Sequence, residues 1–198
     1  MVKVIGLTGS IAVGKSTVTQ YLLTHGYRVL DADVISHQAL QQGTSAYQKV
    51  VSLFGCVNGD GTINRKQLGN IVFTSQDKKK QLESIIHPYV IETLQKGIQE
   101  CQEPLIFLDI PLLFEAHLEC LCDKIIVVYV SEKTQCLRLM NRNHIDEQSA
   151  MHLIHQQMSI EEKKNKGDYI IYNEQNIENL YQDIERVLKV IHDEVIYE

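Results

Sequence analysis

The segment that most constrains this chain is a glycine-rich loop close to the N-terminus, residues 9–16, which fits the pattern G-x-x-x-x-G-K-[ST]. An apolar run at residues 2–7 precedes the loop, and residues 18–24 follow it without Pro or Gly. Strand, loop and helix in this order are what a phosphate-binding loop requires. A glycine-rich turn without a ligand is the alternative, and the flanking strand and helix disfavour it.

The residue types of the loop explain how it would hold a nucleotide. Glycines allow successive backbone N–H groups to turn toward one anion, and the helix that starts near Lys15 adds the positive end of its dipole. Lys15 is expected to reach the β- and γ-phosphates, and the Ser16 hydroxyl is the expected Mg²⁺ ligand. The residues expected to contact the nucleotide are Gly9, Ala12, Val13, Gly14, Lys15, Ser16 and Thr17.

Composition bounds the class of protein. At 198 residues and 44% hydrophobic, the chain is expected to form one domain with small insertions. A net charge of −6, from 19 basic and 25 acidic residues, argues against binding to nucleic acid or to an anionic membrane. The sequence predicts neither a targeting segment nor a membrane span.

Cysteine usage predicts a reducing compartment, the cytoplasm. The chain has five cysteines and no C-x-x-C pair. Cys120 and Cys122, with His117 close by, form a conceivable metal site, but no second pair of ligands accompanies them. Buried thiols are the favoured interpretation.

Alternation of apolar runs with helical segments predicts an α/β fold, a three-layer α/β/α sandwich around a mostly parallel five-stranded sheet, as in P-loop NTPases. Between residues 34 and 102 helices dominate, which predicts a helical insertion, and Pro88 is expected to break its last helix by a kink or a restart. The strands are expected at residues 2–7, 27–30, 105–110, 124–130 and 169–172.

Carboxylates follow two of these strands, at the sheet edge where ligands bind in open α/β folds. Asp31 and Asp33 follow the second strand, and either could instead cap the helix after it; one serving as the cap while the other acts is the alternative to both acting. Asp109 is a candidate for the carboxylate that supports a metal ion, although it could equally cap a turn, and Glu115 is the alternative.

Two arginines further along the chain offer positive charge. Arg138 and Arg142 are four residues apart on a predicted helix, so they share a face. Such a face is usually solvated, but beside a phosphate loop it can clamp a triphosphate. His87 is read first as a core or capping histidine.

Two classes of function compete: a phosphotransferase and a GTPase-type switch. Residues 165–168 match the N-K-x-D element that reads guanine, but a polar segment precedes them and the chain has no D-x-x-G. A small kinase fits better, because a helical insertion can hold an acceptor while an arginine-bearing segment closes over ATP.

Over nearly its whole length the chain resembles the dephospho-coenzyme A kinase family. The segments that carry the resemblance are Gly6-Leu7-Thr8-Gly9, Asp31-Ala32-Asp33, Asn64-Arg65-Lys66 with Leu68 and Phe73, His87-Pro88, Pro111-Leu112-Leu113-Phe114-Glu115, Arg138 to Arg142, Gln157, Glu162-Lys163 and Asp168-Tyr169. The resemblance implies transfer of the γ-phosphoryl group of ATP, with Mg²⁺, to the ribose 3′-hydroxyl of dephospho-coenzyme A. Another small-molecule or nucleoside monophosphate kinase is the alternative, and the oligomeric state is left open.

The resemblance also implies roles for particular residues. Asp33 would orient or deprotonate the 3′-hydroxyl, Arg65 would meet the charged end of the acceptor, and Lys15 and Arg142 would complete the catalytic set. Thr8, His87, Leu112 and Glu115 would line the acceptor site. The core would comprise residues 1–33, 103–137 and 168–198, with an acceptor-binding insertion at 34–102 and a lid at 138–167.

The phosphate loop departs from the family's usual Gly-Gly-Ile-Gly-Ser-Gly-Lys. The departures are Ser10, Ala12 and Val13. Ala12 has less backbone freedom than Gly, which makes nucleotide affinity the property to measure.

Overall fold

The structure is a computed structural model that describes residues 2–197. The chain divides into two compact units, Asp31–Glu100 and the remainder, which joins Met1–Leu30 to Cys101–Glu198. The elements are β1 (Lys3–Thr8), α1 (Lys15–Thr24), β2 (Arg28–Asp31), α2 (Ala32–Ala39), α3 (Ser45–Phe54), α4 (Arg65–Thr74), α5 (Gln76–Gln99), β3 (Leu105–Asp109), η1 (Glu119–Leu121), β4 (Lys124–Tyr129), α6 (Glu132–Asn143), α7 (Glu147–Ile154), α8 (Ile160–Lys166), β5 (Tyr169–Tyr172) and α9 (Ile177–Tyr197).

The sheet has the strand order β2-β3-β1-β4-β5. β1 lies at its centre and pairs in parallel with β3 on one side and β4 on the other, and β4 pairs in parallel with β5. Every residue of β3 is buried, as expected of a strand covered on both faces. The five-stranded, mostly parallel α/β fold expected from the sequence is confirmed. Because parallel strands end at the same edge, the phosphate loop after β1 and Asp109 at the end of β3 are brought together.

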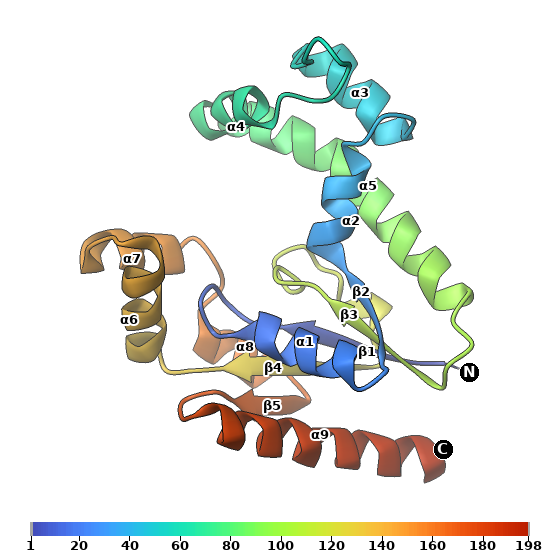
Figure 1. Ribbon diagram of the computed structural model, residues 1–198, viewed down its shortest axis with the longest axis vertical. Helices are drawn as coiled ribbons and strands as arrows, with labels where there is room; N and C mark the ends of the chain where they lie inside the picture. The colour runs from blue at the N-terminus through green and yellow to red at the C-terminus, as the bar shows by residue number, and fades with distance from the viewer. Residues whose placement is uncertain (1, 198) are drawn as a thin grey trace. The chain divides into compact units, whose positions relative to one another are not determined.

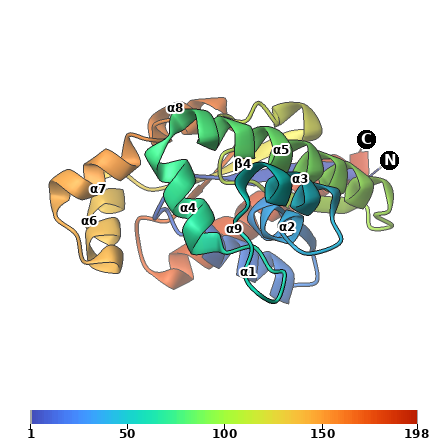
Figure 2. The same ribbon diagram turned by 90° about the horizontal axis from the view of Figure 1, so that it is seen from above.

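Helices cover both faces of the sheet. α1 and α9 lie on one side of the strands and α8 on the other (Figures 1 and 2). α9 presents an apolar stripe at helical spacing, with Leu180, Ile184 and Ile191 buried. α6 and α7 stand side by side as a helical hairpin (Figure 1). Within the part of the chain that the structure describes, no helix is long and apolar enough to cross a membrane.

The helical unit contains α2 to α5, which confirms that helices dominate this stretch. Its core forms around Val50, Cys56, Ile63 and Leu68, and α5 packs against α2, α3 and α4. The expected restart near Pro88 is wrong, because α5 runs as one helix from Gln76 to Gln99 with Pro88 inside it. Pro88 removes one backbone donor, and packing along three neighbouring helices holds the helix together in spite of that loss.

Candidate active site

The phosphate loop joins the end of β1 to the first turn of α1. Gly14 is the N-cap of α1, with φ of 88°, and no side chain caps the helix there. The N–H groups of Lys15 and Ser16 are therefore left for a ligand at the positive end of the helix dipole, whereas the Thr17 N–H donates to the Gly14 carbonyl at 3.0 Å. A side chain at position 14 would place its Cβ 2.2 Å from Nδ2 of Asn173, so a residue other than glycine there would have to displace the Asn173 side chain. Ala12 also has a positive φ, 62°, without being a glycine.

Side chains outside the loop hold its shape at Val13. Nδ2 of Asn173 donates to the Val13 carbonyl at 2.8 Å, and Nη1 of Arg138 reaches the same oxygen at 3.5 Å. Arg138 also donates from Nη2 to the carbonyl of Asn173 at 2.7 Å. The Val13 carbonyl is therefore held by these donors and does not compete with the loop N–H groups that would face an anion. Neither Asn173 nor this use of Arg138 was foreseen.

Lys15 is held by the buried Asp109. The Lys15 ammonium pairs with Oδ1 of Asp109, whose side chain is 2% exposed, and the Thr19 hydroxyl donates to Oδ2. Asp109 therefore holds a side chain of the phosphate loop, and its predicted role as the carboxylate that supports a metal ion stays a prediction. A lysine aimed by a buried carboxylate is pre-organised as a charge for phosphate.

A second paired lysine, the buried Lys163 of α8, lies on the other flank of this site. Its side chain is fully buried, its ammonium donates to the Pro111 carbonyl at 2.9 Å, and Oε1 of Glu115 lies 2.9 Å away. The Thr8 hydroxyl donates to the same Pro111 carbonyl at 3.1 Å. Burial lowers the pKa of Lys163, and the bond to Glu115 opposes that shift. Thr8 and Glu115 are thus brought together, as members of one polar network.

Lys163 was missed as a site residue by sequence reasoning. Its one local signal is position: it falls three residues after the buried Ile160, on the inward face of a short helix. A lysine on the inward face of a helix needs a partner for its ammonium group, because burying an unpaired charge costs too much free energy.

Of the two aspartates after β2, Asp31 is the one that caps the helix. Oδ1 of Asp31 accepts from the backbone N–H groups of Asp33 and Val34, at 2.8 and 3.0 Å, so Asp31 caps α2. The Asp33 side chain is exposed, and it has no hydrogen-bond partner among the described residues of the helical unit. It stays free to meet a ligand.

Other predicted contacts are exposed. Arg65 opens α4, after its N-cap Asn64, and is exposed, as is His87 on α5. His87 is therefore not a core histidine. Leu112 is 45% exposed, beside the buried Leu113. These residues remain predictions as acceptor contacts.

The two arginines of α6 differ in their surroundings. Arg138 is half-buried and braces the phosphate loop, as described above. Arg142 is exposed and donates only within its own turn, from Nε to Oδ1 of Asn143 at 3.1 Å. The guanidinium of Arg142 is thus exposed to solvent, and contact of either arginine with a nucleotide stays a prediction.

The donor set suits Mg²⁺ held mainly by phosphate and water. Among the described residues, no cluster of three or more His, Cys, Asp or Glu side chains could cage a metal ion. The exposed Ser16 hydroxyl, in the first turn of α1, fits a cation that keeps most of its ligands from substrate. The expectation of buried thiols is wrong for Cys120, which is exposed, whereas Cys122 is partly buried and burial raises its pKa to about 12.

The N-K-x-D match is explained by structure. Gly167 ends α8, and Asp168 precedes β5. Oδ2 of Asp168 accepts from the Ile125 backbone at 2.8 Å, and Oδ1 accepts from Lys124 at 3.2 Å. The aspartate thus fixes the start of two strands and does not face a base.

Known proteins similar to this chain agree on one family. The family model described as dephospho-CoA kinase matches residues 3–179. Dephospho-CoA kinase of Oceanobacillus iheyensis is 43% identical over 194 residues, covering 96% of this chain and 98% of that protein. The protein of the same name from Listeria monocytogenes serotype 4b is 40% identical over 195 residues, covering 96% and 97%.

Solved structures point the same way. Dephospho-CoA kinase from Campylobacter jejuni superposes with a TM-score of 0.75 at 32% identity, covering 96% of this chain and 98% of that one. Shikimate kinase from Acinetobacter baumannii, at 14% identity, has a TM-score of 0.56 and shares the fold alone. The family model matches residues 3–179, and the two relatives each match 96% of this chain. The chain therefore belongs to the dephospho-CoA kinase family.

Proposed function

We propose that this protein transfers the γ-phosphoryl group of ATP to the ribose 3′-hydroxyl of dephospho-coenzyme A, giving coenzyme A and ADP. The reaction is the last step of coenzyme A synthesis. The observation that carries the proposal is the uncapped first turn of α1 with Lys15 aimed by the buried Asp109, in a chain of this family. A cytoplasmic location remains a prediction from the free cysteines.

Phosphoryl transfer needs positioned groups and positive charge more than covalent chemistry. The loop N–H groups and Lys15 hold the β- and γ-phosphates, and Arg142 neutralises charge that develops in transfer. Asp33, whose carboxylate is exposed, orients the 3′-hydroxyl and takes up its proton. Thr8, Arg65, His87, Leu112 and Glu115 contact the acceptor. Mg²⁺, bound through Ser16 and the phosphates, would supply further charge neutralisation.

The test is an acceptor screen with radiolabelled ATP, using dephospho-coenzyme A, adenosine, shikimate and nucleoside monophosphates. Phosphorylation of dephospho-coenzyme A far above the others is expected. A nucleoside monophosphate as the preferred acceptor would establish the alternative kinase function.

Two aspartates provide a matched pair of variants for the catalytic role. Asp33→Asn should abolish turnover, because an amide cannot accept the proton. Asp31→Asn should leave turnover nearly unchanged, because Asn caps a helix as well as Asp does. Equal activity in the two variants, measured by coupled ADP release, would remove Asp33 from the mechanism. Lys15→Ala should also lose turnover, because it removes the charge that holds the β- and γ-phosphates.

A further inference from the structure

Ile11, inside the phosphate loop, has both of its backbone polar groups bonded to glutamine side chains. Nε2 of Gln135 donates to the Ile11 carbonyl at 2.7 Å, and the Ile11 N–H donates to Oε1 of Gln157 at 2.9 Å. One loop peptide on each side of Ile11 is thereby fixed. The pair of side chains acts on the loop as a neighbouring strand would, by one donor and one acceptor.

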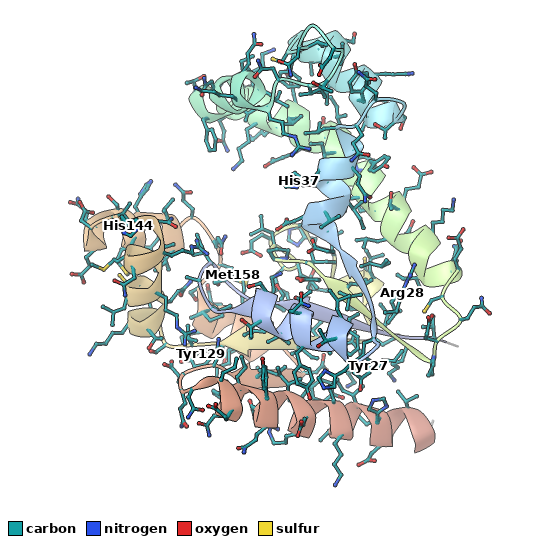
Figure 3. The ribbon with its side chains drawn as sticks, viewed as in Figure 1. Tyr27, Arg28, His37, Tyr129, His144 and Met158 are labelled. Atoms are coloured by element: carbon teal, nitrogen blue, oxygen red, sulfur yellow. The ribbon has the colours of Figure 1, made fainter. Side chains whose placement is uncertain are left out.

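The two glutamines stand at the two ends of the α6–α7 hairpin. Gln135 lies in the first turn of α6, and Gln157 follows the end of α7 at Ile154. The carbonyl of the next residue, Met158, accepts a hydrogen bond from the Ser10 hydroxyl at 3.2 Å. Met158 is labelled in Figure 3. The hairpin therefore leaves and rejoins the rest of the chain against the same stretch of the loop.

Apolar packing reinforces these bonds. Ile11 and Ala12 pack against a buried cluster that the hairpin itself forms from Cys136, Leu139, Ala150 and Ile154. A shift of the hairpin would then move the loop, because side chains of the loop are embedded in the hairpin's core. The contact is formed by protein alone and does not need a nucleotide to bridge it.

The burial of Gln135 indicates that its amide serves the loop more than stability. The side chain is fully buried, and its Oε1 has no hydrogen-bond partner within the described part of the chain. Rotating the amide would set Oε1 against the Ile11 carbonyl, so the observed orientation is the one that makes a bond. A buried amide satisfied on one side only contributes little to stability compared with an apolar side chain of the same size.

We propose that Gln135 and Gln157 are positioning residues for nucleotide binding: together they clamp Ile11, so that the phosphate loop and the α6–α7 hairpin adopt their binding geometry as one unit. Gln135 acts as the donor and Gln157 as the acceptor. The inference rests on nucleotide binding by the loop and not on the identity of the acceptor. Its ligand is a nucleoside di- or triphosphate.

The experiment measures ADP binding by calorimetry, KM for ATP and for dephospho-coenzyme A, and the melting temperature. Gln135→Met and Gln157→Met keep side-chain size and remove the bonds. Each should weaken ADP binding by about fivefold, the loss of one hydrogen bond of about 1 kcal/mol, and raise KM for ATP while leaving KM for the acceptor near wild type. Gln157→Glu keeps an acceptor for the Ile11 N–H and should bind ADP more tightly than Gln157→Met does. Because both glutamines act on one residue, the double Met variant should lose less than the product of the single losses.

Gln156→Met is the matched control, because Gln156 is exposed and bonds only to His152 in its own turn. It should bind ADP as wild type does. ADP affinity within twofold of wild type in both Met variants would overturn the clamp, as would equal changes in both KM values together with a lower melting temperature. Calorimetry with ADP reads the clamp directly, so a wrong acceptor would fail the screen above without touching this result. The half-buried Gln157 keeps the test open if Gln135→Met does not fold.

Discussion

Replacement of Gly14 by alanine tests how tightly the phosphate loop is framed. Gly14 has φ of 88°, and an alanine there meets a backbone cost of about 1–2 kcal/mol for the left-handed conformation. Its Cβ would also lie 2.2 Å from Nδ2 of Asn173. Asn173 must then withdraw and give up its bond to the Val13 carbonyl, a further loss of about 1 kcal/mol. We expect Gly14→Ala to lower the free energy of unfolding by about 2–3 kcal/mol.

Gly26 supplies the control for the backbone part of this loss. It has φ of 81° in the same unit, and a Cβ built there meets nothing within 4 Å. Gly26→Ala should therefore lose only the backbone cost, about 1–2 kcal/mol. Urea unfolding of both variants gives the difference, expected at about 1 kcal/mol.

The pair Gly14→Ala and Asn173→Ala completes a double-mutant cycle. Once Asn173→Ala has removed the amide, Gly14→Ala no longer displaces it, so the double variant should be about 1 kcal/mol more stable than the summed single effects predict. Equal losses at Gly14 and Gly26, or additive effects in the cycle, would refute the idea that Asn173 frames the loop. The Gly14 variant should also lose affinity for ADP.

The remaining predictions concern the lid, the thiols and one tyrosine. Arg142→Ala should reduce kcat/KM at least about tenfold, or ~1.4 kcal/mol of transition-state stabilisation, and an unchanged rate in coupled ADP release would return Arg142 to the solvated surface. With iodoacetamide at pH 8, mass spectrometry should find the exposed Cys120 labelled before Cys122, whose pKa burial raises to about 12; early labelling of Cys122 would contradict its burial. The hydrogen bond from Tyr129 to Glu161 is the largest cause, and burial the second, that raises the pKa of Tyr129 to about 12. The bond therefore stabilises the fold below pH about 10, and this contribution is lost as pH rises through about 12. Tyr129→Phe should remove that part of the fall in unfolding free energy, and an unchanged pH profile would show that the bond contributes none of it.

Local sequence patterns were sufficient to predict the strands and the phosphate loop. The buried β3 is an unbroken apolar run, and the S-x-x-E spacing of Ser159 and Glu162 is the local pattern of the capping box that these residues form. These features depend on neighbours in sequence, so the pattern carries them. Local patterns predict less where packing between distant segments decides the structure. Pro88 was expected to break α5, and contacts with three other helices, which a local pattern does not contain, keep the helix whole.

The residues that frame the site were harder to predict, for the same reason. The bonds from Gln135 and Gln157 to Ile11 join residues 124 and 146 positions apart. A glutamine on a helix has no local mark that it will meet a loop peptide. Lys163 was overlooked because a lysine is expected at the surface, and only the full burial of its side chain and its pairing with Glu115 reveal it.

The outward bonds of the phosphate loop bear on how this loop can vary. Since Ile11 and Val13 are gripped by side chains from distant segments, the curvature of the loop is imposed from outside as well as by its glycines. Ser10, Ala12 and Val13 can then differ from the usual residues while the curve persists. If only the loop is randomised, more substitutions should therefore preserve its shape than the motif suggests. If Gln135 and Asn173 are varied as well, the same loop substitutions should disrupt that shape.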